Sequence, residues 1–91
     1  MPSSTKITLS PQVTAFASTL HPERRRAIKA ALRELSHGRG DHKALKDELA
    51  GFHRLRVGRY RIIYELCHDG SIECVFLEDR SIVYEKFSPS S

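Results

Sequence analysis

The sequence predicts a single α+β domain in which an antiparallel pair of helices packs on one face of a mostly antiparallel sheet. The chain has 91 residues, the size of one small domain. Its first half carries apolar residues at three- and four-residue spacing, which is typical of amphipathic helices. Its second half alternates apolar and polar residues between turn signals, which is typical of strands. We expect one domain over residues 1–91, with an ordered core over about residues 5–87.

The first half begins with a short N-terminal strand, Lys6–Leu9, followed by two helices. Ser10 is the expected N-cap of the first helix, because its hydroxyl can accept a backbone N–H and Pro11 suits the first helical position. The second helix begins at Pro22 and ends before Gly38, which suits the left-handed position after a helix. Since few residues separate the two helices, we expect an antiparallel helix hairpin.

The second half begins with a polar connector over residues 38–51, in which 44–49 can form one helical turn. Short turns at Gly58-Arg59 and Asp69-Gly70 make the strands that they join antiparallel. A short extended or turn segment covers 81–87. The three expected strands lie at about residues 53–57, 60–67 and 72–77.

Positive charge is concentrated in the first of these strand hairpins. Lys and Arg number 15 and Asp and Glu number 11, for a net charge of +4. The segment Phe52–Tyr64 contains four arginines and no acid, so the rest of the chain is balanced in charge. Such a local patch is expected where a protein meets a phosphate backbone or an acidic partner.

The register of this hairpin places arginines face to face. With a two-residue turn at Gly58-Arg59, Arg56 pairs with Arg61, and Arg54 follows on the same face. Like charges directly opposite each other destabilise a sheet by roughly 0.2–1 kcal/mol, so fold stability does not require them. Fixed guanidinium groups can instead hold a phosphate and stabilise charge that develops on it. A solvated sheet face whose charges block aggregation is the alternative.

The other face of the hairpin is apolar and is expected to pack on the helices, which leaves the arginine face open. The register of the third strand is undecided, because a three-residue turn would exchange its two faces. Cys74, Phe76 and Glu78 are therefore left without an assigned face. The basic run 24–26 lies beside the apolar stripe of the second helix and is expected to be its solvated side.

The remaining composition excludes several classes of protein. Cys67 and Cys74 fit neither a CxxC nor a zinc pattern, and the five histidines lack metal-ligand spacing. We expect no metal, no cofactor and two reduced, buried or half-buried thiols. Neither a long apolar run nor a signal-peptide pattern is present, so we expect a cytoplasmic protein without a membrane span.

The centre and the end of the sequence resemble the RelE/ParE toxin superfamily. The family typically has a leucine-containing turn and a glycine, a basic strand, and then Tyr-Arg, two aliphatic residues and Tyr. The stretch Leu45–Tyr64 has this order and ends in Tyr60-Arg61-Ile62-Ile63-Tyr64. The segment Arg80–Tyr84 is similar to the family's basic residue followed by Val-Tyr. The resemblance covers about residues 5–87 and implies a RelE-like fold.

The resemblance implies a toxin of a type II toxin–antitoxin system that inhibits translation as a ribosome-dependent mRNA endonuclease. In such an enzyme the ribose 2′-hydroxyl attacks the neighbouring phosphate and leaves a cyclic phosphate. Because arginine does not readily release a proton, the general base would be Tyr84, His53 or no single residue. The candidate catalytic residues are Arg56, Arg61 and Tyr84. The candidate RNA- or phosphate-binding residues are Arg54, Arg59 and Arg80.

Two other functions remain open for the same sequence. One is a ParE-like module that poisons DNA gyrase without cleaving anything, and the other is a non-toxic, partner-binding relative. Both toxin interpretations imply a cognate antitoxin, which we expect to be acidic and partly disordered and to form a hetero-oligomer with the toxin. It would cover the basic face or displace the C-terminal segment. The further partners of the endonuclease would be the ribosome and mRNA.

Overall fold

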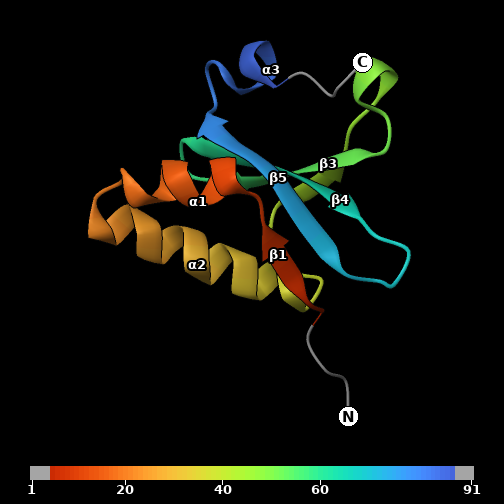
Figure 1. Ribbon diagram of the computed structural model, residues 1–91, viewed down its shortest axis with the longest axis horizontal. Coiled ribbons are helices and arrows are strands. Elements are labelled where there is room, and N and C mark those ends of the chain that lie inside the picture. The colour runs from red at the N-terminus through yellow and green to blue at the C-terminus, as the bar shows by residue number, and fades with distance from the viewer. Residues whose placement is uncertain (1–4, 88–91) are drawn as a thin grey trace.

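A five-stranded sheet with two helices on one face forms the body of the molecule. The computed structural model describes residues 5–87 (Figure 1), so the first and last four residues of the predicted domain lie outside the described residues. The strand order is β1-β5-β4-β3-β2, and only the β1–β5 pair is parallel. The elements are β1 (Ile7–Leu9), α1 (Pro11–Ser18), α2 (Pro22–Ser36), β2 (His42–Ala44), the 3₁₀ turn η1 (Asp47–Leu49), β3 (Phe52–Val57), β4 (Tyr60–Leu66), β5 (Ile72–Asp79) and α3 (Val83–Lys86).

The two long helices begin as the sequence predicts. The Ser10 hydroxyl accepts the Val13 N–H at 3.2 Å and donates to the Val75 carbonyl, so one side chain both caps α1 and ties it to β5. Gln12 adds a second tie, because its amide bonds the Leu77 carbonyl and N–H, each at 2.8 Å. The helices α1 and α2 lie side by side, as expected for a helix hairpin (Figure 1).

The main core lies between these helices and the sheet. Leu55, Ile62 and Leu77 supply its sheet side and are at most 1% exposed. Val13 supplies part of the α1 side, and α2 contributes residues at helical spacing. The α2 residues buried there are Ile28, Leu32 and Leu35. Cys74 is buried in the same core and Cys67 is half-buried, both as free thiols. The predicted fold class and the apolar face of the hairpin are confirmed.

A bulge decides the register of β5. Ile63 pairs with Phe76, but Tyr64 pairs with Cys74, so Val75 is the additional residue on β5. Cys74 therefore lies on the helix-covered face, whereas Phe76 and Glu78 lie on the opposite face. The bulge shifts the alternation of side chains along β5, so that Ile72 and Cys74 lie on the same helix-covered face as Leu77.

The opposite face is open over only part of its length, which corrects the expectation that this basic face is left open. Ile63 points away from α1 and α2 and is nevertheless fully buried. Phe87 packs over this position, with its ring 5.1 Å from that of Phe52 and 5.5 Å from that of Phe76. The sheet thus has a second, smaller apolar cluster under the C-terminal segment, made of Phe52, Ile63, Phe76, Val83 and Phe87.

One element differs from the sequence-based expectations. His42–Ala44, expected within the polar connector, forms the edge strand β2 beside β3. All three of its residues are exposed, so the segment carries no hydrophobic pattern that would predict a strand. The segment 81–87, expected to be extended or a turn, contains the helical turn α3, in which Val83 is buried against the sheet.

Candidate phosphate-binding site on the open sheet face

Three strand arginines meet on the part of the sheet that α3 leaves uncovered. Val57 pairs with Tyr60 and Arg56 pairs with Arg61, which confirms the predicted turn and register. Arg54 pairs with Ile63, one step further along the same face. Three positive charges on adjacent strands repel one another, so the fold alone does not account for them.

Arg61 lies at the centre of this group. Its Nη1 donates to the carbonyls of Gly58 and Tyr60, at 2.9 and 2.8 Å, which fixes the guanidinium beside the hairpin turn. Burial lowers the pKa of Arg61, and the charges of Arg56 and Arg54 lower it further. The side chain stays protonated, because the ordinary pKa of arginine is above about 12. The site therefore holds a fixed positive charge, and an anionic ligand would reduce its repulsion from the neighbouring arginines.

Asp41 adds a carboxylate to this cluster from the beginning of β2. Its Oδ1 accepts from Arg54 Nη1 at 3.3 Å, and its Oδ2 lies 3.7 Å from Arg56 Nη1. The backbone holds it there, because the Arg56 N–H donates to the Asp41 carbonyl at 2.9 Å. Gly40 lets the chain pass close to the core, with a φ of +105° and Leu55 Cδ1 3.4 Å from where a Cβ would be.

The C-terminal candidates approach the same cluster from β5 and α3. Arg80 follows β5, and Tyr84 lies on α3 with 45% of its surface exposed. The charge of Arg80 lowers the pKa of Arg61 and the Tyr84 phenol raises it, so both groups are electrostatic neighbours of Arg61. Figure 1 shows α3 beyond the end of β5, on the other side of the sheet from α1 and α2.

Buried groups hold α3 in this place. Val83 is fully buried, and Lys86 Nζ lies 3.4 Å from Glu78 Oε1. Glu78 is only 7% exposed, and its other oxygen accepts the Asp79 N–H at 3.0 Å. The helical turn that carries Tyr84 is therefore attached to β5 by an ion pair as well as by apolar contact.

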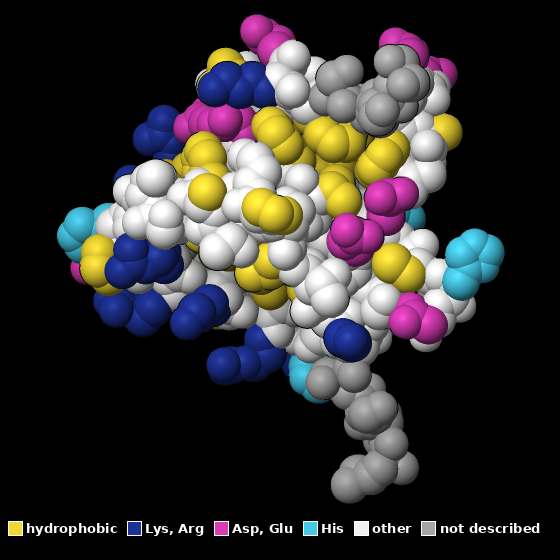
Figure 2. Space-filling view, viewed as in Figure 1, with side chains coloured by type: hydrophobic (Ala, Val, Ile, Leu, Met, Phe, Trp, Pro, Cys, Tyr) yellow, Lys and Arg dark blue, Asp and Glu magenta, His cyan; other side chains and the backbone are white. Residues whose placement is uncertain are grey.

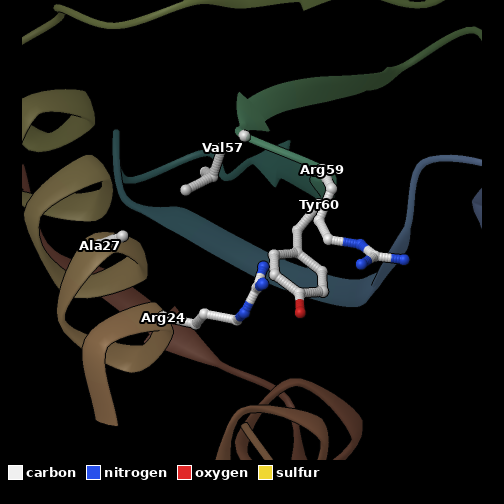
Figure 3. A pocket seen from close by; sticks show the side chains of 6 residues that line it. Arg24, Ala27, Val57, Arg59 and Tyr60 are labelled. Atoms are coloured by element: carbon white, nitrogen blue, oxygen red, sulfur yellow. The ribbon is translucent and has the colours of Figure 1, made fainter. Parts of the chain in front are cut away.

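Arg59, by contrast, does not join the other candidates. Its Nε donates to Asp79 Oδ2 at 2.7 Å, which raises the pKa of Arg59. It lines a small cavity of about 100 Å³ between the hairpin turn and α2 (Figure 3). In this cavity the Arg24 guanidinium reaches over the Tyr60 ring, 5.8 Å from its centroid. Arg59 therefore stabilises the turn on the helix side of the sheet.

His53 also lies away from the arginines. Its ring stacks on Tyr64 with a centroid distance of 5.2 Å and an interplanar angle of 15°. Both rings line a cavity of about 260 Å³ that reaches Leu35 of α2 and Ile72 of β5. Adjacent residues of a strand point to opposite faces, which predicts that His53 and Arg54 are separated, and the register of β3 confirms it.

Basic side chains also gather along α2. Figure 2 shows Lys and Arg side chains at the lower left, over this helix, and acidic side chains mainly at the top and right. Arg25 Nη1 donates a hydrogen bond to the Leu20 carbonyl at 2.9 Å, whereas Arg24, Arg26 and Lys29 are exposed. The positive charge of the molecule thus extends beyond the strand arginines.

No helix within residues 5–87 is long and apolar enough to cross a lipid bilayer. No group of three or more His, Cys, Asp or Glu side chains in that range is arranged as a metal site.

Sequence reasoning overlooked three side chains at the site, Asp41, Glu78 and Lys86. Asp41 lies in a polar connector, and only the pairing of β2 with β3 brings it beside Arg56. Glu78 could be assigned to a face only once the bulge in β5 was known. A signal was available for Asp41 alone, because Gly40-Asp41 is a turn-forming pair just before the basic strand.

Comparison with solved structures establishes the fold. A chain of the RelBE2 toxin–antitoxin complex of Mycobacterium tuberculosis is 21% identical with a TM-score of 0.74, covering 89% of this chain and 97% of that one. A chain of the archaeal RelE–RelB complex of Pyrococcus horikoshii is 22% identical with a TM-score of 0.70, covering 86% and 97%. YafQ of Escherichia coli is 16% identical with a TM-score of 0.66, covering 88% and 98%. The expected RelE-like fold is confirmed.

The sequence matches no protein-family model and no curated protein.

Proposed function

We propose that this chain, which has the fold of RelE and YafQ, is the toxin of a type II toxin–antitoxin system and cuts mRNA on the ribosome. The observation that carries the proposal is the gathering of Arg54, Arg56 and Arg61 on an open sheet face, with Arg80 and Tyr84 as neighbours of Arg61. Such a face suits an RNA phosphate better than it suits folding, because the three arginines repel one another and the Asp41 carboxylate pairs with only Arg54 and Arg56.

The proposed reaction is transfer of the phosphate to the ribose 2′-oxygen. Arg54 and Arg56 would bind the scissile phosphate, and Arg61 would stabilise the negative charge that grows on its oxygens. Arg61 is the best placed for this role, since two backbone carbonyls fix its guanidinium before substrate arrives. Tyr84 is exposed enough to stack on a base or to exchange a proton with the substrate.

The proposed partner is an acidic antitoxin that folds on binding. A negatively charged segment would compensate the repulsion among the strand arginines and block access of RNA to them. Two of the three similar structures described above come from toxin–antitoxin complexes. We propose that the protein acts in the cytoplasm, where ribosomes and mRNA are found.

The test is inducible expression of the wild type beside Arg61→Ala, with mapping of mRNA 5′ ends. We expect growth arrest with new cuts inside translated messages, and loss of both in the variant. Removing one preorganised charge stabiliser typically lowers the rate by about 10²–10³-fold. Growth arrest without mRNA cuts would indicate a gyrase poison instead of an endonuclease. Absence of growth arrest would indicate a non-toxic binding protein.

A further inference from the structure

The proposed reaction needs a group that accepts the proton of the attacking 2′-hydroxyl. None of the strand arginines can do so, because a guanidinium keeps its proton at physiological pH. His53 is stacked on Tyr64 on the helix side of the sheet, away from the arginine face. Of the general-base candidates named from the sequence, Tyr84 alone is left, unless another residue of the open face can take the proton.

We propose that Asp41 is the general base that takes the proton from the ribose 2′-hydroxyl, an inference that rests on the proposed function. Within residues 5–87, it is the acidic residue whose ion pairs join it to the strand arginines, at 3.3 Å from Arg54 and 3.7 Å from Arg56. A phosphate bound by these guanidinium groups lies beside the carboxylate. The Asp41 side chain is 55% exposed, so substrate can reach it and its proton can leave to water.

The order of the strands supports this assignment. Across the open face, the groups follow one another as Asp41 at β2, Arg54 and Arg56 on β3, Arg61 on β4, and Tyr84 after β5. In-line displacement at phosphorus requires the attacking and leaving oxygens on opposite sides of the phosphate. A phosphate held by the central arginines therefore has a carboxylate on one side and a phenol on the other.

The reaction is balanced with these two groups. The O2′–P bond forms as the P–O5′ bond breaks, and the 2′-hydroxyl proton moves to Asp41. Tyr84 gives its hydroxyl proton to the leaving 5′-oxygen, and the phenolate that results lies near Arg61. The products are a 2′,3′-cyclic phosphate and a 5′-hydroxyl, and both side chains recover their protonation states by exchange with water.

The alternatives are that Asp41 is structural or occupies the phosphate position until RNA displaces it. Asp41→Asn separates them, because an asparagine keeps an oxygen that can accept from Arg54 and keeps the backbone bond to Arg56. The assay is single-turnover cleavage of a short mRNA positioned in the ribosomal A site. We expect a loss of about 10²–10⁴-fold, the usual range for a positioned base.

Controls separate binding and folding from chemistry. The variant should bind ribosomes carrying the same mRNA with a 2′-deoxyribose at the cleavage site as tightly as the wild type does, and should unfold at the same temperature. Asp41→Glu should restore part of the rate. Glu48→Gln, which removes an exposed carboxylate of η1 from outside the two strands that carry the arginines, should cut at the wild-type rate.

A substrate with sulfur in place of the 5′-bridging oxygen distinguishes the two proton transfers. A thiolate leaves without needing a proton, so this substrate should restore the rate of Tyr84→Phe but not that of Asp41→Asn. Restoration of Asp41→Asn would overturn the assignment. Cleavage by Asp41→Asn at the wild-type rate would make the residue structural, and faster cleavage would make it a displaceable anion. If the wild type itself leaves the mRNA intact, the proposed function fails and the inference fails with it.

Discussion

The two faces of the sheet are made from the same strands but are used differently. On the helix-covered face, Leu55, Ile62 and Leu77 follow one another across β3, β4 and β5 in a continuous apolar layer. On the opposite face, an apolar end under α3 gives way to an arginine end beside the hairpin turn. The first face accounts for stability, and the second divides its length between attaching α3 and presenting charge.

The division of the second face has a physical reason. The Tyr84 side chain is carried by α3, and a single helical turn cannot hold a position by itself. Phe87 and Val83 anchor that turn on apolar strand residues a few positions from the arginines. The small apolar cluster thus keeps the helical turn that carries Tyr84 on the same side of the sheet as the strand arginines.

The strongest test of this comparison uses two adjacent residues of β4 that point to opposite faces. Ile62→Ala should lower the free energy of unfolding by about 2–5 kcal/mol, because Ile62 is fully buried between the sheet and the helices. Arg61→Ala should change it by no more than about 0.5 kcal/mol, since the lost hydrogen bonds are offset by relief of repulsion from Arg56. Urea unfolding measures both. A similar loss in the two variants would contradict the separation of roles.

A smaller effect is expected from the apolar end of the open face. Val83→Ala removes two buried carbon atoms from the apolar cluster. It should reduce the free energy that holds α3 on the sheet by about 1.6 kcal/mol. Amide hydrogen exchange should rise about tenfold in residues 83–87 and remain unchanged in β4, because the docked turn opens locally. Faster exchange throughout the sheet would show that α3 is part of the main cooperative unit.

The sequence predicted the β3–β4 hairpin correctly, because the alternation of its side chains agrees with the pairing of its strands. Alternation along β3 and a two-residue turn were enough to pair Arg56 with Arg61, because parity fixes the face once the turn is known. The same reasoning left the faces of β5 undecided, and they are fixed by the extra residue Val75, which leaves no signal in the pattern.

The rest of the site depended on contacts between distant segments. Asp41 reaches Arg54 across 13 positions of sequence, through an edge strand with no buried residue. Arg59 belonged to the basic run by composition, but its ion pair with Asp79 spans 20 positions and holds it on the other side of the sheet. The sequence pattern therefore predicted that Arg54, Arg56 and Arg61 share one face of the sheet, but not that Arg59 lies apart from them.

The ion pair between Arg59 and Asp79 makes the stability of the protein depend on pH. The Ser81 N–H and hydroxyl, followed by Arg59, hold the pKa of Asp79 well below its usual range. A depressed folded pKa adds stability above the unfolded value of about 3.9, and that stability is lost as the pH falls toward the folded value. Asp79→Asn should lower Tm at pH 7 by less than Val83→Ala does, and the difference from wild type should shrink toward pH 2. A difference that is constant with pH would show that the charge of Asp79 contributes nothing.

The smallest expected effect compares two arginines on opposite sides of the same hairpin. Arg24→Gln removes the guanidinium that stands over Tyr60 and should cost about 0.5 kcal/mol of stability, the usual size of an exposed cation–π contact. Its effect on mRNA cleavage should stay within about threefold, because the helix side of the sheet takes no part in the proposed reaction. Arg56→Gln removes the same charge from the open face and should slow cleavage by about 10²-fold. If single-turnover cleavage falls equally in the two variants, the RNA is bound by the total positive charge of the molecule and not by one face of its sheet.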